Sequence, residues 1–395
     1  MNRTLDLRSL LAGGFLVLLL AMGIGRFAYT PLLPPMMSQY GFGAEEVGLL
    51  ASLNYLGYLV GAFLAAALCR ALGERNLLAL GLALSAATTA AAGLSLDFSW
   101  VGAARLLSGL ASAFCFVAAS GVVLTALARE GRDGLAGLFY GGVGCGIVLS
   151  GLLAVPLVER FGAAGSWLVL GLLSALLAAC AWRLLSAGCA ERRPQGGGAS
   201  FPLPRHGRFV RLVAAYGLEG FGYIITGTFL VAAARTTFDS GGAASVWILA
   251  GCAAVPSAYL WSLAARRHGA LRPLILAHGM QAVGIALPVF FPQPAGVILG
   301  ALLFGATFMG IVGLSLSLGG NLLPAARGRV IGLMTGVYGI GQIIGPSLAG
   351  MLAARTGSFD LSLLIAAAAV CAGGLLLMPD ALSARSESSS RAGGL

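Results

Sequence analysis

The sequence predicts an all-α, polytopic membrane protein with twelve transmembrane helices, arranged as two six-helix halves of related sequence. Three observations lead to this prediction. Hydrophobic residues make up 58% of the chain and charged residues 10%, whereas soluble domains contain about 45–50% and about 25%. Apolar segments long enough to cross a bilayer follow one another along the chain. In addition, a seven-residue motif recurs 194 residues downstream.

Each bilayer span requires about 20 predominantly apolar residues. We therefore expect helices near residues 9–34, 46–69, 76–96, 99–128, 134–158, 165–186, 209–235, 244–265, 273–291, 294–322, 329–354 and 359–378. Short loops that contain turn-forming residues separate most of these spans. The expected organisation is an N-terminal bundle at 1–186, a cytoplasmic linker at 187–208, a C-terminal bundle at 209–378 and a cytoplasmic tail at 379–395.

The arginines predict the orientation. All 24 basic residues are Arg, and nineteen of them lie on the side of the predicted bundle that holds both termini, against three on the other side: Arg160, Arg235 and Arg355. Cytoplasmic loops carry such an excess of positive charge. We expect both termini and the linker in the cytoplasm of a bacterium, with the bundle in its inner membrane. Because the arginines are dispersed over short loops, the net charge of +10 does not indicate nucleic-acid binding.

The recurring motif indicates an internal duplication. Residues 23–29 read GIGRFAY and residues 217–223 read GLEGFGY, both inside apolar segments. A second match, at an offset of 195, pairs Gly137-Leu138, Gly141, Gly144, Gly146, Leu153 and Ala154 with Gly332-Leu333, Gly336, Gly339, Gly341, Leu348 and Ala349. A weaker one pairs Leu106-Leu107-x-Gly109 with Leu302-Leu303-x-Gly305. Two related halves are typical of secondary transporters, whose solute site lies near the membrane midplane between them.

These features resemble the major facilitator superfamily over residues 10–378. The stretches at 23–34 (GIGRFAYTPLLP), 216–224 (YGLEGFGYI), 304–310 (FGATFMG) and 341–346 (GQIIGP) look like its YbfB/YjiJ-type branch. The resemblance implies the twelve-helix fold and does not identify a solute. Residues 105–109 (RLLSG) are similar to the Arg-x-x-x-Gly motif associated with proton coupling in many members. The loop at 66–75 lacks the Asp of the superfamily pattern there.

Glu219 is the one acidic residue that lies well inside a predicted span. Two interpretations are open: a proton-coupling or solute-binding carboxylate, or a structural ion pair with Arg26 or Arg105. Tyr223 and Thr226 follow Glu219 at i+4 and i+7, so the three share one helix face.

Arg26 lies in the middle of the first predicted span, where a charged side chain normally faces the bundle interior. With Tyr29 and Thr30 it forms a polar stripe expected to bind an anionic solute or Glu219, and a purely architectural role is the alternative. Arg105 is predicted to take part in proton coupling or to reach the membrane interface.

Several uncharged side chains complete the predicted site. Asn54, Tyr58 and Gln342 are expected to bind solute or to form interhelical hydrogen bonds. His278 and Gln281 share an i, i+3 face, for which we favour a structural or interfacial role over a proton relay. No cofactor is expected, and three isolated histidines do not indicate a metal site.

The sequence therefore predicts a secondary transporter that moves a small organic solute by alternating access and uses the proton gradient, with efflux favoured over uptake. Uptake of an anionic solute by proton symport is the alternative. A receptor-like membrane protein that does not transport is an alternative of another class. An enzyme is not expected, because no nucleophile, metal or cofactor constellation is recognisable. The expected partners are the small-molecule solute, protons and the lipid bilayer, with no nucleic acid, and the chain is expected to be a monomer.

Overall fold

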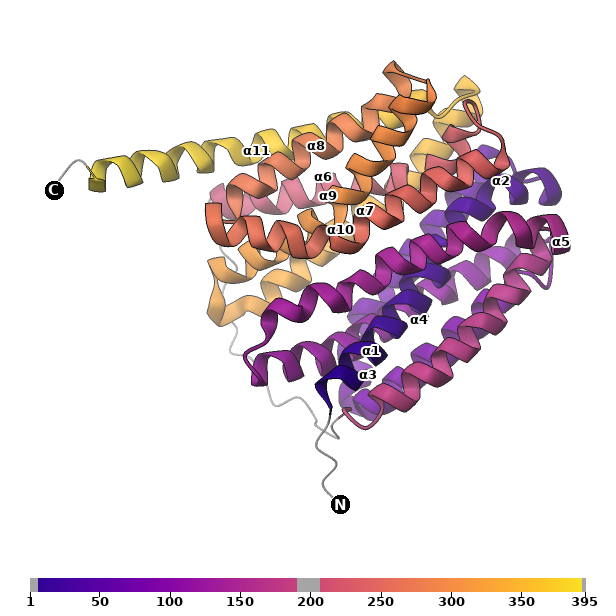
Figure 1. Cartoon of the computed structure of the whole chain (residues 1–395), viewed down its shortest axis with the longest axis horizontal. Helices are drawn as coiled ribbons and strands as arrows, with labels where there is room; N and C mark the ends of the chain where they lie inside the picture. Colours follow the sequence, from indigo (N-terminus) through magenta and orange to yellow (C-terminus); the bar gives the residue numbers. More distant parts are fainter. Residues whose placement is uncertain (1–5, 190–206, 393–395) are drawn as a thin grey trace.

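The computed structural model describes residues 6–189 and 207–392, and all regular secondary structure in these two ranges is helical. The elements are α1 (Leu7–Leu18), η1 (Leu19–Phe27), α2 (Tyr29–Tyr40), α3 (Ala44–Ala91), α4 (Phe98–Arg129), η2 (Asp133–Leu135), α5 (Ala136–Leu185), α6 (Gly207–Ala234), α7 (Ser240–His268), α8 (Leu271–Phe290), α9 (Pro294–Leu322), η3 (Pro324–Ala326), α10 (Arg327–Thr356) and α11 (Asp360–Ala392). Figure 1 shows the long helices running roughly side by side through one bundle.

Ten helices in the described ranges are long and apolar enough to cross a membrane. Two of them, α3 with 48 residues and α5 with 50, exceed one span, because about 20 residues are sufficient. Each contains one glycine outside the helical conformation: Gly73 in α3 has φ 82° and Gly162 in α5 has φ 68°. Only glycine adopts such a backbone without strain, so each helix changes direction at this residue.

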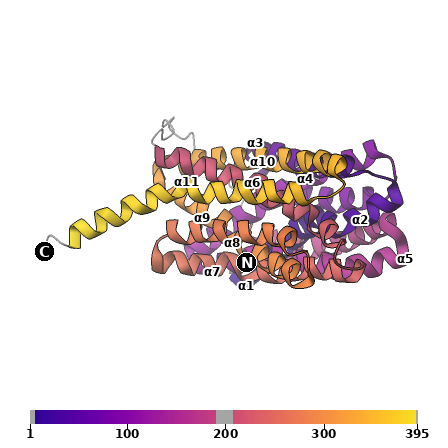
Figure 2. The same ribbon diagram turned by 90° about the horizontal axis from the view of Figure 1, so that it is seen from above.

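The first span differs from its predicted boundaries. Residues 9–34 were expected, whereas α1, η1 and α2 together extend from Leu7 to Tyr40. Pro31 does not end the helix because a break at Ala28 places it in the first turn of α2, where a backbone N–H would have no intrahelical partner. The last helix also differs, since α11 continues past residue 378 and projects beyond the bundle (Figures 1 and 2).

The helices connect two ends of the bundle. We call one the basic end, because most described arginines lie there; it holds residues 7–10, 70–76, 129–135, 183–189, 207–211, 266–272, 322–329 and 380–382. Contacts there include the ion pair between Arg211 and Asp380. The opposite end holds residues 39–44, 92–97, 159–163, 235–240, 290–294 and 356–360. There the Ala163 N–H donates to Gln39 Oε1 at 2.6 Å.

Close helix contacts recur at matching places in the two parts of the chain. A Cβ on Gly23 would lie 2.3 Å from Gly146 Cα, and one on Gly341 would lie 2.6 Å from the Gly217 carbonyl oxygen. Gly217 and Gly341 are the residues that the sequence repeats pair with Gly23 and Gly146. The repeated glycines therefore lie at helix crossings where main chains touch, as expected for small residues between membrane helices.

Candidate functional site

The first candidate residues are positioned by an unusual helix. Residues Leu19–Phe27 form a nine-residue π-helix, η1, whose wider turn is rare and frequently found at functional sites. Side chains from α4 donate to its backbone: Arg105 Nη1 and Ser108 Oγ both donate to the Gly25 carbonyl at 3.0 Å.

Arg26 is 3% exposed and surrounded by aromatic rings. Its Cζ lies 4.1 Å from the Tyr58 ring centroid and 4.8 Å from that of Tyr55, and its Nη1 lies 3.8 Å from Met22 Sδ. The Nε and Nη2 atoms have no hydrogen-bond partner, and no carboxylate of a described residue forms an ion pair with this guanidinium. A buried charge without a counter-ion is costly. The role of Arg26 in binding an anionic solute stays a prediction, and its two unpartnered nitrogens are compatible with it.

Arg105 is also buried, at 2% exposure, so it does not reach the membrane interface. In addition to Gly25, it donates from Nη2 to the Arg26 carbonyl at 3.4 Å, and its Cζ lies 4.5 Å from the Tyr29 ring centroid. Asn54 Nδ2 donates to the Arg105 carbonyl at 2.8 Å. These contacts brace the π-helix against α4. The proton-coupling role of Arg105 stays a prediction.

Glu219 lies on α6, fully buried, and accepts a 2.9 Å hydrogen bond at Oε1 from Gln281 Nε2 on α8. Its Oε2 atom has no partner in the protein. The expected ion pair with Arg26 or Arg105 is absent among the described residues. A buried carboxylate that lacks a cation is stabilised by binding a proton.

Tyr223 and Gln342 meet directly, since Gln342 Nε2 donates to the Tyr223 hydroxyl at 2.5 Å. The Tyr223 ring is nearly parallel to Tyr338 (18°, centroids 5.5 Å apart) and Phe308 (7°, 5.8 Å). Thr226, on the same helix, is buried and its hydroxyl has no partner. The wall formed by α6, α9 and α10 is therefore aromatic with a few polar groups.

Two predicted solute ligands instead join helices. The Tyr29 hydroxyl donates to the Val47 carbonyl at 2.8 Å, and Thr30 Oγ1 donates to the Gly227 carbonyl at 2.5 Å. Arg26 and Tyr29 thus face different neighbours, and the stripe predicted for the first span is divided between them. The structure brings Arg26 to Tyr58, Asn54 to Arg105 and Tyr223 to Gln342, but it does not bring Glu219 to either arginine.

The sequence-based selection missed Tyr55 and Met22, both in contact with the Arg26 guanidinium. The position of Tyr55, three residues before Tyr58 on the same helix, was the available signal. Met22 could not have been selected, because its i, i+4 position relative to Arg26 is equally typical of core packing.

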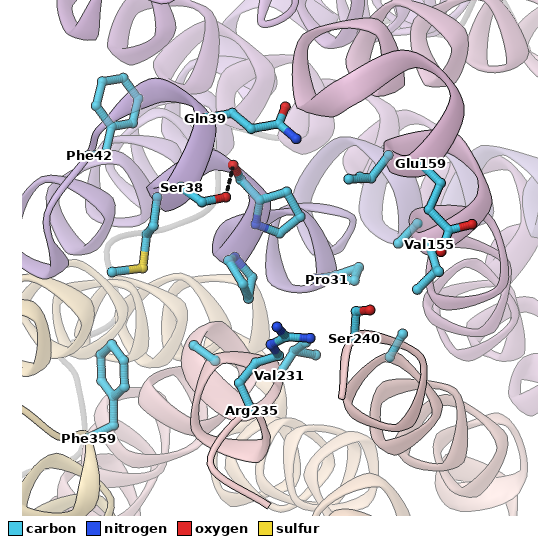
Figure 3. Close-up of a pocket in the computed structure, with 17 residues that line it drawn as sticks. Pro31, Ser38, Gln39, Phe42, Val155, Glu159, Val231, Arg235, Ser240 and Phe359 are labelled. Carbon is cyan, nitrogen blue, oxygen red and sulfur yellow. Dashed lines mark hydrogen bonds between the residues drawn. The ribbon is translucent and has the colours of Figure 1, made fainter. Parts of the chain in front are cut away.

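A cavity of about 610 Å³, which we call the vestibule, lies at the opposite end between the first span, α5, α6 and α7. In Figure 3 the side chain of Arg235, the residue that follows α6, points into it, while Glu159 lines it from α5. Pro31 lines it from the first span. Between Pro31 and Arg26 along the chain, Thr30 contacts Gly227, and the rings of Phe27 and Trp247 lie 6.2 Å apart.

Among the described residues, no group of three or more His, Cys, Asp or Glu side chains is arranged to hold a metal ion. The buried polar atoms of the candidate site that lack a partner include two nitrogens of the Arg26 guanidinium, one oxygen of the Glu219 carboxylate and the Thr226 hydroxyl.

Comparison with known proteins places the chain in a family. Residues 18–378 match the family described as "Uncharacterised MFS-type transporter YbfB". The chain belongs to this YbfB-type family of the major facilitator superfamily. It is a multi-pass membrane protein of a transporter family.

Two relatives illustrate the relationship. The chain is 28% identical over 366 residues to monocarboxylate transporter 13 of Bos taurus, with 85% of this chain and 80% of that protein covered. A crystal structure of the nucleoside transporter NupG superposes with a TM-score of 0.78 at 16% identity, covering 94% of this chain and 99% of that one. Because the identity to NupG is only 16%, this similarity shows the shared fold alone.

Proposed function

We propose that this protein is a proton-coupled symporter that carries a small organic monocarboxylate across the membrane by alternating access. The observation that carries the proposal is the buried Arg26 guanidinium, which has two nitrogens without a partner and no counter-carboxylate. A planar guanidinium binds a carboxylate through two parallel hydrogen bonds. The bovine relative, a monocarboxylate transporter by name, supports this solute class.

The proton is assigned to Glu219. Its free Oε2 in a fully buried position provides a site for one proton. Movement of an anion with a proton leaves no net charge to transfer, which lowers the cost of crossing an apolar environment. The expectation of efflux rested on Arg105 and on a largely apolar cavity. Because the contacts of Arg105 brace η1 and Arg26 is suited to an anion, we favour uptake by symport.

The proposal includes the organisation of the chain. Because α3 and α5 are each longer than two spans and turn at Gly73 and Gly162, we assign two crossings to each, which gives twelve. The repeated glycine contacts support two six-helix halves on either side of residues 187–208. The arginines at the basic end support a cytoplasmic location for that end and both termini, in a bacterial inner membrane.

Purified protein in proteoliposomes tests the function. With an imposed pH gradient, acidic outside, wild type is expected to accumulate radiolabelled pyruvate above protein-free liposomes and not to accumulate uridine. Arg26→Ala should reduce accumulation to background, whereas Arg160→Ala, at an exposed arginine, should retain it. Uridine accumulation that does not depend on Arg26 would contradict the proposal.

A further inference from the structure

A row of buried polar side chains leads from Glu219 toward the basic end. Glu219, Gln281 and His278 are each 0% exposed. Each retains one polar atom without a partner in the protein: Glu219 Oε2, Gln281 Oε1 and His278 Nε2. Buried polar atoms are nearly always satisfied, so three unsatisfied atoms in one place require an explanation. An ordinary packing role for these side chains does not supply one.

The helices place these groups in order. Both α6 and α8 begin at the basic end, and each residue adds about 1.5 Å. His278 lies seven residues into α8 and Gln281 ten, while Glu219 lies twelve residues into α6. His278 is therefore nearer the basic end than Glu219, with Gln281 bonded to Glu219 between them.

The contacts of His278 leave one ring nitrogen able to accept a proton. Nδ1 lies 2.9 Å from the Leu274 carbonyl oxygen, which accepts only from a protonated nitrogen. In a neutral imidazole with Nδ1 protonated, Nε2 carries a lone pair, and this atom has no hydrogen-bond partner in the protein. Near the Nε2 side of the ring, a Cβ on Gly373 would lie 3.4 Å from Nε2 and 3.1 Å from the Ala215 carbonyl oxygen. Nε2 is therefore the atom at which this ring can take up a proton.

The neighbouring helices leave this ring without a competing charge. On α6 the nearest titratable residues are Tyr216 and Glu219, α9 carries no titratable side chain, and α11 presents Gly373 and Gly374 to the ring. Nearer the basic end, α6 and α11 are joined by the ion pair of Arg211 with Asp380. The carboxylate of Asp380 therefore lies nearer the basic end than His278, which contacts Gly373 and Gly374 earlier on the same helix.

We propose that His278 is a second proton station, through which Glu219 exchanges its proton with water at the basic end. In release, the O–H bond of protonated Glu219 breaks and, through intervening water, an N–H bond forms at His278 Nε2. The imidazolium then loses that proton to water at the basic end. Gln281 is a positioning residue, because its amide fixes the Glu219 carboxylate. This inference rests on the proposed symport.

The proton-station role of His278 is tested by comparing net pyruvate uptake with pyruvate exchange. Net pyruvate uptake driven by a pH gradient requires proton release at the basic end, whereas exchange of labelled for unlabelled pyruvate proceeds with the carrier protonated. His278→Leu and His278→Gln are each expected to lower net uptake about ten-fold and to leave exchange within about two-fold of wild type. Gln can donate to the Leu274 carbonyl but cannot accept a second proton, so a packing role would be rescued by it.

A second variant leaves the histidine intact. Gly373→Ala places a methyl group 3.4 Å from Nε2 and 3.1 Å from the Ala215 carbonyl oxygen, where it crowds Nε2, and should lower net uptake about three-fold without a change in exchange. Gly279→Ala, where no atom lies within 4 Å, and Ser315→Ala, at a buried unpartnered hydroxyl on α9, are matched controls. Net uptake at the wild-type rate in both His278 variants would contradict the role of His278 as a proton station and would leave the proposed symport intact. A wild type that does not accumulate pyruvate would contradict the symport itself, and this inference with it.

Discussion

The two copies of the seven-residue motif share their packing and differ in backbone and charge. The first copy lies in the π-helix η1 and carries Arg26, whereas the second lies in the regular α-helix α6 and carries Glu219. In the first copy, donors from α4 reach the Gly25 and Arg26 carbonyls. In the second, one amide reaches the carboxylate.

The two copies can be compared property by property. The glycine contacts are alike, because both crossings need backbone approach that a side chain would prevent. The charged groups have diverged and remain unpaired with each other. A guanidinium and a carboxylate that formed an ion pair would satisfy one another, whereas two separate groups each keep a free atom for a ligand. In the proposed function, the first copy binds the solute anion and the second copy carries the proton.

The largest expected effect concerns the shared packing. Gly23→Ala places its methyl 2.3 Å from Gly146 Cα, main chain that cannot move aside, whereas Gly217→Ala meets the Val337 side chain at 2.7 Å. Overpacking costs about 1–3 kcal/mol or more, so Gly23→Ala should lower the melting temperature by about 5–10 °C and Gly217→Ala by less. Gly313→Ala, with no atom within 4 Å, is the control. Equal losses at both positions would mean that the two crossings are equally tight.

The next effect concerns the guanidinium of the first copy. Removal of one partner of a buried charge pair costs about 2–5 kcal/mol, so Arg26→Ala should weaken pyruvate binding by about 30-fold or more. Arg26→Lys keeps the charge and loses the planar fork, and should weaken it by about ten-fold. Isothermal titration calorimetry on detergent-solubilised protein measures both. Unchanged affinity in Arg26→Ala would remove this residue from the site.

Substitution of Arg105 distinguishes a structural role, in which it holds η1 against α4, from a role in proton coupling. If its guanidinium serves the Gly25 and Arg26 carbonyls, Arg105→Lys should lower the melting temperature by a few degrees, since each lost buried hydrogen bond to a charged group costs about 1.5–3 kcal/mol. Pyruvate affinity should stay within about three-fold, and the ratio of net uptake to exchange should stay at the wild-type value. A fall in that ratio would instead support the proton-coupling role predicted from the sequence.

The sequence was sufficient for the properties that depend on composition and repeats. Long apolar segments predicted the membrane helices, and the glycines at offsets of 194 and 195 predicted equivalent helix positions. The π-helix was not predictable, because hydrophobic periodicity in an all-apolar segment does not separate an α-turn from a π-turn. The continuation of α11 beyond residue 378 was missed because that segment becomes polar while it remains helical.

The sequence identified most residues of the candidate site, but it did not show which residues they contact. Burial of Arg26 and Glu219 followed from the cost of a charge in lipid, whereas for Arg105 a position at the membrane interface was an open alternative. Their partners depend on helix rotation, which a sequence without alignment does not define. An ion pair between Glu219 and an arginine was therefore a reasonable expectation, and the structure instead shows Gln281 at the carboxylate.

The smallest expected effect concerns the rings around Arg26. The Tyr58 ring lies 4.1 Å from the guanidinium carbon, and a cation–π contact contributes about 0.5–2 kcal/mol. Tyr58→Phe should keep pyruvate affinity within about two-fold, while Tyr58→Leu should weaken it by about three- to ten-fold. Equal affinities in the two variants would indicate that the ring does not hold Arg26 in place.

The division of roles between the copies is tested most directly by proton flux in Glu219→Gln. Proteoliposomes that contain a pH-sensitive dye report proton movement when pyruvate is added outside, and exchange of labelled pyruvate is measured in the same preparation. The account predicts pyruvate-dependent proton influx in wild type and none in Glu219→Gln, with exchange retained in both. Proton influx in Glu219→Gln at the wild-type rate would contradict it, because the second copy would then not carry the proton.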